Sequence, residues 1–161
     1  MEIGGNKKEV FGIDNLSLIK NIKYFELCIE INKDDFSFAL INENYELVRL
    51  EKHPIKSETE QEKINKIEKI ILSNKFLKKR TRKCKLVLND DLFTIMPNNL
   101  FDIKKHKEYY NFCFEENKNQ EIIFKNIESI NATSIFSIEK DLKRIILDFF
   151  PKSEITHASI N

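Results

Sequence analysis

Three residues with oxygen-bearing side chains, Asp34, Asp35 and Ser37, lie in and just after a polar break between two apolar runs. Carboxylates bind Mg²⁺ through one or two contacts, and water and phosphate complete the shell. One possible role is therefore the binding of a magnesium nucleotide. The alternative is an ordinary polar hairpin turn. The sequence favours the turn, because no glycine follows Gly12 and a backbone that wraps phosphate closely usually needs residues without a Cβ atom.

Acidic residues near predicted strand ends suggest a second chemistry, the two-metal cleavage of nucleic acid. Such sites hold two divalent ions about 3.5–4 Å apart between carboxylates from several elements. The candidates are Glu30, either Glu62 or Glu68, and Asp90 with Asp91. Charged residues make up 33% of the chain, so acids also fall at strand ends by chance. A solvated sheet edge is the simpler interpretation.

The densest run of basic residues, from Lys75 to Lys85, could bind nucleic acid or another anion. A polar helix end that leads into a strand is the simpler interpretation. The chain has a net charge of +1, which argues against a dedicated nucleic-acid binder and against a general attraction to anionic membranes. We therefore expect no nucleic-acid partner.

The histidines and the clustered aromatic residues give no catalytic pattern. The histidines are far apart and have no cysteine or acid at metal-ligand spacing, so structural roles are expected for all three: His53, His106 and His157. One aromatic cluster is expected to pack inside a small subdomain rather than to form a binding patch: Tyr109, Tyr110, Phe112 and Phe114.

Cysteine usage and hydropathy indicate a compartment. Cys28, Cys84 and Cys113 are far apart and odd in number, and each lies in an apolar pattern. This predicts buried free thiols in a reducing cytosol. The N-terminus has no signal-peptide hydrophobic region, and no apolar run reaches the roughly 18 residues of a membrane span. We therefore expect a cytoplasmic protein.

The elements that position these residues begin with a three-stranded antiparallel meander. Apolar and polar residues alternate from Tyr24 to Asn32 and again from Phe36 to Leu40, which is typical of half-buried strands. The polar residues from Lys33 to Asp35 form the turn between them. A third strand runs from Tyr45 to Lys52 and ends before Pro54.

A helix and a parallel strand are predicted next. Ser57 and Glu60 have the spacing of a capping box, and isoleucines at three- and four-residue spacing predict an amphipathic helix from Thr59 to Asn74. Lys83 to Asn89 reads as a strand buried on both faces, parallel to the first strand across this helix. Three strands, a helix and a strand form the opening order of ribonuclease-H-like folds.

The remaining residues predict a small α/β insert and a return to the first sheet. Its helix is expected to turn Tyr109, Tyr110, Phe112 and Cys113 inward, and Ser137 is expected to cap the last helix, whose apolar stripe includes Leu142 and Phe149. In chain order, the elements are a strand at 92–96, a helix from 102 to about 115, strands at 121–126 and 132–138, a helix up to Pro151, and a strand at 153–160. Residues 1–8 are expected to be a loose end and 10–22 an extended lead-in.

Several of these segments resemble domain-of-unknown-function family 3822, a bacterial family. The resemblance covers about Tyr24 to Ser159 and rests on packing patterns in three pairs of segments: 25–31 with 35–38, 92–97 with 100–102, and 130–138 with 157–159. That family is similar to a degenerate member of the actin-like ATPase superfamily. Its nearest shapes are the pilus-assembly and cell-division members, in which a ribonuclease-H-like subdomain carries an inserted strand-helix-strand-strand subdomain.

The resemblance implies a nucleotide site whose first phosphate loop, with Asp and Gly, connects the first two strands. Here the connection runs from Asn32 to Asp35 without glycine, which departs from the pattern. The candidate nucleotide-binding residues are Asn32, Asp34, Asp35 and Ser37, with Mg²⁺ and ATP as the possible cofactors. The resemblance also implies a longer protein whose second half follows Asn161. Without that half, an ATP site would need a second chain.

We therefore predict an α/β protein that forms one half of an actin-like, ribonuclease-H-like fold. Residues 1–23 form the lead-in, 24–91 the ribonuclease-H-like subdomain, which 152–161 rejoin, and 92–151 the inserted subdomain. We expect a non-catalytic interaction or scaffold module, with no metal and with a protein partner or a second copy. A residual nucleotide-binding ATPase half and a two-metal nuclease are the alternative hypotheses.

Overall fold

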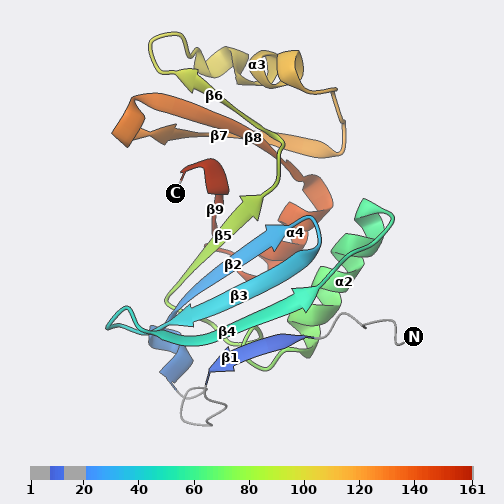
Figure 1. Ribbon diagram of the computed structural model, residues 1–161, viewed down its shortest axis with the longest axis vertical. Helices are drawn as coiled ribbons and strands as arrows, with labels where there is room; N and C mark the ends of the chain where they lie inside the picture. Colours follow the sequence, from blue (N-terminus) through green and yellow to red (C-terminus); the bar gives the residue numbers. More distant parts are fainter. Residues whose placement is uncertain (1–7, 13–20, 161) are drawn as a thin grey trace, which may run out of the picture.

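The computed structural model describes residues 8–12 and 21–160, which form two sheets with three α-helices (Figure 1). The expected loose end before Lys8 and most of the expected lead-in lie outside these residues. The larger sheet has the order β1-β4-β3-β2-β5-β9. Its strands are β1 (Glu9–Gly12), β2 (Glu26–Asn32), β3 (Asp35–Ile41), β4 (Leu47–Pro54), β5 (Lys83–Asn89) and β9 (Glu154–His157).

The predicted meander is confirmed. Strands β2, β3 and β4 pair antiparallel, and β2 and β3 alternate between buried and half-buried residues along their whole length. The buried positions include Leu27, Ile29, Phe36 and Phe38. Because alternate side chains of a strand point to opposite faces, one face of this sheet is apolar and faces the core.

The predicted crossover is also confirmed. Helix α2 (Glu60–Ser73) connects β4 to β5, and β5 pairs parallel with β2 from Glu26↔Lys83 to Asn32↔Asn89. Leu86, Val87 and Leu88 are all buried, as expected for a strand covered on both faces. Helix α4 (Lys140–Phe149) lies beside α2 on the same side of the sheet (Figure 1). Buried isoleucines and leucines of both helices join the core of the six-stranded sheet.

The second sheet has the order β6-β8-β7 and carries a short helix on one face. Its strands are β6 (Phe93–Pro97), β7 (Gln120–Ile127) and β8 (Ala132–Glu139). The helix is α3 (His106–Cys113), and the 3₁₀ turn η2 (Ile103–Lys105) precedes it. The other 3₁₀ turns are η1 (Ile22–Tyr24), η3 (Glu128–Ile130) and η4 (Ala158–Ile160). The predicted order of strand, helix, strand and strand is therefore confirmed.

The prediction that the residues of α3 turn inward is wrong for two of them. Tyr110 is buried and donates a hydrogen bond to Ser137 Oγ at 2.7 Å, but Phe112 is 93% exposed and Cys113 is exposed. A step of two residues along a helix turns the side chain by about 200°. A helix this short packs on the sheet through one narrow stripe, and Phe112 falls opposite it.

Both helix caps differ from those predicted. Thr59, not Ser57, is the N-cap of α2, and its Oγ1 accepts a hydrogen bond from the Glu62 amide at 3.2 Å. Ser57 donates instead to the Ile55 carbonyl at 3.1 Å. Glu139 is the N-cap of α4, while Ser137 stays inside β8 and bonds Tyr110. Each serine side chain therefore forms a hydrogen bond with another group instead of capping the helix.

The final strand is shorter than predicted. Strand β9 ends at His157, and η4 follows it. Strand β9 pairs parallel with β5 at the edge of the large sheet, so the C-terminal segment does rejoin the first sheet. Within the described part of the chain, none of the helices has the length and apolar character needed to span a membrane.

The three thiols should differ in reactivity. Burial raises the pKa of Cys84 to about 11, and burial also raises the pKa of Cys28, whereas Cys113 is exposed. Because the thiolate is the reactive form, we expect iodoacetamide to label Cys113 first, Cys28 next and Cys84 last. Mass spectrometry of timed digests measures the order, with protein in concentrated guanidinium as the control. Equal labelling of Cys84 and Cys113 in the folded protein would contradict this packing.

Candidate functional site

A cleft of about 790 Å³ opens where the carboxyl ends of β2 and β5 face the second sheet. Its walls come from the β2–β3 hairpin, the turn after β5, the first turn of α2, and the junction between β8 and α4. In open α/β sheets, ligands bind outside the carboxyl ends of the strands. This cleft is therefore the candidate functional site.

The hairpin on the cleft wall satisfies its own backbone. Asn32 Oδ1 accepts hydrogen bonds from the Asp34 amide at 2.9 Å and from the Asp35 amide at 2.7 Å. The Asp34 carbonyl accepts from the Ile55 amide at 2.8 Å. Successive free amides are what allow a loop to bind an anion. Here a side chain already uses two of them, as in an Asx turn.

The cleft is strongly acidic. Six carboxylates and two lysines line it: Asp34, Asp35, Glu60, Asp90, Asp91 and Glu139, with Lys33 and Lys63. Asp35 pairs with Lys52 at 3.0 Å, and Glu60 lies 4.0 Å from Lys63. Counting Lys52, which pairs with Asp35, the six carboxylates face three lysines, so the cleft keeps an excess of negative charge. The cleft repels an unneutralised triphosphate and attracts cationic groups.

Glu139, at the junction of β8 and α4, is one of the carboxylates that line the cleft. Burial raises the pKa of Glu139, a hydrogen bond with Gln120 lowers it, and the negative charges of Glu60 and Asp141 raise it. The net direction is upward. Burial is the main cause of this rise in the pKa, and the two neighbouring carboxylates add to it.

The turn after β5 is tied to the C-terminal segment by His157. Its Nε2 lies 3.2 Å from the Asp90 carbonyl oxygen and 3.5 Å from the Asp90 carboxylate. Its Nδ1 accepts from the Ser159 amide at 3.1 Å and lies 2.9 Å from Ser159 Oγ. Because an amide can only donate, Nδ1 is the unprotonated nitrogen and Nε2 carries the proton.

Ser159, His157 and Asp90 together have the hydroxyl, imidazole and carboxylate groups of a hydrolase catalytic triad. Two observations favour a structural clamp instead. His157 is 1% exposed, and its ring lies 4.6 Å from the Phe93 ring. Ser159 Oγ lies 3.0 Å from Ser134 Oγ, and neither Ser159 nor His157 lines the cleft. Burial would raise the pKa of Asp90, but bonds from His157 and the Leu92 amide lower it overall, so Asp90 stays ionised.

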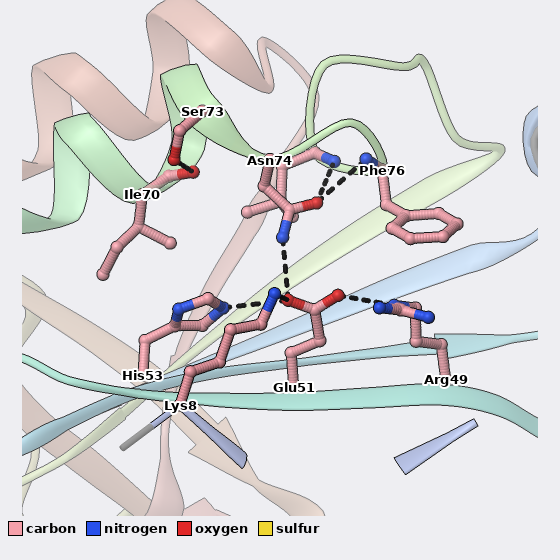
Figure 2. A network of polar contacts seen from close by, with 9 residues as sticks. Lys8, Arg49, Glu51, His53, Ile70, Ser73, Asn74 and Phe76 are labelled. Atoms are coloured by element: carbon pink, nitrogen blue, oxygen red, sulfur yellow. Dashed lines mark hydrogen bonds and ion pairs between the residues drawn. The ribbon is translucent and has the colours of Figure 1, made fainter. Parts of the chain in front are cut away.

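A second polar network, outside the lining of the cleft, surrounds the buried carboxylate of Glu51 on β4 (Figure 2). Its Oε2 receives the Lys8 ammonium at 2.7 Å, His53 Nε2 at 3.0 Å and Asn74 Nδ2 at 2.9 Å. Arg49 Nε donates to Oε1. The side chain of Glu51 is 1% exposed, and a buried carboxylate is tolerated only with such complete pairing.

This network holds the end of α2 against the sheet. Asn74 is the C-cap of α2, and its Oδ1 accepts from the Phe76 amide at 2.9 Å and the Leu77 amide at 3.4 Å. The Arg49 guanidinium lies 4.2 Å from the centroid of the Phe76 ring. The segment that follows α2 is therefore fixed by buried contacts.

The structure brings together most, but not all, of the predicted site residues. Asn32, Asp34 and Asp35 line the cleft, while Ser37 does not and pairs with Glu30 in the β2–β3 ladder. Sequence reasoning missed Glu51. Arg49, Glu51 and His53 alternate on one face of β4, but only the structure shows that Arg49 and Glu51 on this face are buried.

The acids proposed for a two-metal site do not converge. Asp90 and Asp91 line the cleft, but Glu30 accepts a hydrogen bond from Asn89 at 2.8 Å, and neither Glu62 nor Glu68 reaches the cleft. Among residues 8–12 and 21–160, no three His, Cys, Asp or Glu side chains are placed to hold a metal ion. The arrangement gives no support to the nuclease hypothesis.

The Glu51 network predicts a pH dependence of stability. Burial would raise the pKa of Glu51, but bonds from His53, Lys8 and Arg49 lower it from 4.5 to about 2. The ionised form therefore stabilises the fold above about pH 5, and this contribution is lost as the pH falls towards 2. We expect Glu51→Gln to lower the free energy of unfolding at pH 7 by about 3 kcal/mol.

Urea unfolding measured between pH 3 and pH 7 tests this expectation, since the variant should also lose most of the dependence on pH below 5. Glu43→Gln, in the exposed β3–β4 turn, is the matched control and should keep both the stability and its pH dependence. If the free energy of unfolding of Glu51→Gln fell below pH 5 as steeply as that of the unmodified chain, the central role of this carboxylate would be contradicted.

Comparison with known proteins identifies the family and the fold of the chain. No curated protein matches it. It is similar to a Bacteroides thetaiotaomicron protein with actin-like ATPase fold and unknown function, with a TM-score of 0.83 and 18% identity. The match covers 92% of this chain and 56% of that one, so this chain spans little more than half of its length. A family model described as "Protein of unknown function (DUF3822)" matches residues 14–160. The chain therefore belongs to the DUF3822 family and has an actin-like ATPase fold.

Proposed function

We propose that this chain is a non-catalytic interaction module, in which the cleft of an actin-like fold binds protein rather than nucleotide. One observation carries the proposal: Asn32 Oδ1 occupies the Asp34 and Asp35 amides, in the loop that would otherwise face a phosphate. An amide that donates to a side chain is not available to a phosphate oxygen without breaking that bond.

The charge of the cleft supports the same proposal. The carboxylates that line it outnumber the lysines three to one. A triphosphate would enter this potential only as its magnesium complex, whereas a basic protein segment would be attracted directly. Complementary potentials of this kind speed the encounter of two proteins and favour the correct partner.

We also propose that the chain is divided into two subdomains and a lead-in. Residues 24–91, rejoined by 152–161, would form the supporting subdomain, residues 92–151 an inserted one, and residues 1–23 a lead-in. The separation of the two sheets supports this division. We propose a bacterial, cytoplasmic setting, which the organism of the similar structure and the free thiols support.

A residual nucleotide-binding half is the alternative function. The position of Asp34 and Asp35 on the cleft wall favours it, because carboxylates at this edge could hold Mg²⁺ together with phosphate. The similar structure is longer, so in this alternative a further segment or a second chain would complete the adenosine pocket.

Isothermal titration calorimetry with MgATP separates the two functions. We expect no saturable heat from the purified chain, because binding must displace Asn32 from two amides and overcome the negative potential. Asp34→Asn tests the alternative, with Glu43→Gln on the remote β3–β4 turn as the control. Saturable, Mg²⁺-dependent binding that Asp34→Asn weakens and Glu43→Gln does not would refute the proposed function.

A further inference from the structure

A basic surface lies at the end of the large sheet opposite the cleft. The segment between α2 and β5 and the start of β5 carry six exposed cations and no acid: Lys75, Lys78, Lys79, Arg80, Arg82 and Lys83. Arg82 pairs with Glu26 at 2.7 Å. Residues 75–83 include six basic residues and no acidic one, so the segment presents a concentrated positive potential. We call these six residues the basic surface.

The basic surface is preformed. Phe76 and Leu77 are 1% and 2% exposed and anchor the segment in the core, so the cations between them and β5 point outward. The Arg82 amide donates to the Phe25 carbonyl at 2.9 Å, and Asn74 holds the start of the segment through its two amide bonds. A backbone that is already fixed reduces the conformational entropy lost when a partner binds.

The basic surface and the acidic cleft lie at opposite ends of the same pair of strands. Lys83 begins β5 and Asn89 ends it, with the carboxyl end of β5 toward the second sheet (Figure 1). Residues 88–92 at that end line the cleft. Seven residues of strand separate the two by about 20 Å. They therefore cannot pair within one molecule, but they can pair between two.

We propose that a second copy of this chain docks head to tail, with the basic surface of one copy in the acidic cleft of the next. This inference rests on the proposed function, because a cleft filled by nucleotide has no room for a partner. Charge complementarity and the placement of both surfaces on one chain favour a second copy over an unrelated partner. Such a contact joins two different surfaces, so it does not close on itself and produces a growing chain of copies.

Sedimentation velocity without nucleotide tests the docking. The mean mass should rise with concentration beyond that of a dimer at an ionic strength near 0.01 M, where the Debye length is about 30 Å. It should fall to the monomer near 1 M, where that length is about 3 Å. A mass that stays at the monomer at low salt, or stops at two copies, would overturn the proposal.

Two variants with one damaged surface each provide the sharper test. The first combines Asp34→Lys with Asp91→Lys in the cleft, and the second combines Lys78→Gln, Lys79→Gln and Arg80→Gln in the basic surface. Each variant alone should associate at least about tenfold more weakly than the unmodified chain. Mixed together, they should form a one-to-one pair that does not grow, because only one intact cleft meets one intact basic surface.

The matched control neutralises three exposed lysines elsewhere, Lys104→Gln, Lys105→Gln and Lys107→Gln on η2 and α3, and should associate like the unmodified chain. Circular dichroism confirms that every variant is folded. Equal weakening by the control, or variants that fail to pair when mixed, would overturn the proposal. A monomer that binds no MgATP would refute only the head-to-tail docking, whereas MgATP binding without self-association would refute the proposed function as well.

Discussion

The parallel pairing of β2 with β5 is the constraint on which the rest of the molecule depends. Parallel neighbours require a crossover, and α2 supplies it on the apolar face of the sheet. The same pairing aligns the carboxyl ends of both strands, so the β2–β3 hairpin and the turn after β5 meet as two walls of one cleft. It also places the segment that follows α2 at the opposite end, together with all its cations.

Two polar networks stabilise this arrangement, one level with the middle of the large sheet and one at the cleft. Near the end of α2, the buried Glu51 connects β4 to Asn74 and to Lys8 beside β1. At the cleft, His157 connects the turn at Asp90 to the C-terminal segment. Both networks bury a polar group that would be destabilising alone, so each works only while all its partners are in place.

The periodic parts of the fold could be predicted from the sequence, and the reasons are local. Apolar and polar residues alternate in β2 and β3, and isoleucines form one stripe along α2. Each pattern indicates one buried face, so the strands, the helix and the crossover between parallel strands could be predicted from them. Strand β4 shows where this logic stops: its buried face holds Arg49 and Glu51, while Leu50 is 39% exposed. Two partners distant in sequence, Asn74 and Lys8, help to explain that inversion. The turn at Asn32 is a local motif, because an asparagine side chain often bonds the backbone amides that follow it. No local pattern indicated that Phe112 would face solvent.

The account therefore rests on a loop that is already satisfied by its own side chain. Two-dimensional ¹H–¹⁵N NMR of the backbone amides during a titration with MgATP tests this claim most directly, because it observes the two amides themselves. The account predicts that the Asp34 and Asp35 resonances keep their positions throughout the titration. Saturable shifts of both resonances, dependent on Mg²⁺, would show a phosphate displacing Asn32 and would contradict it.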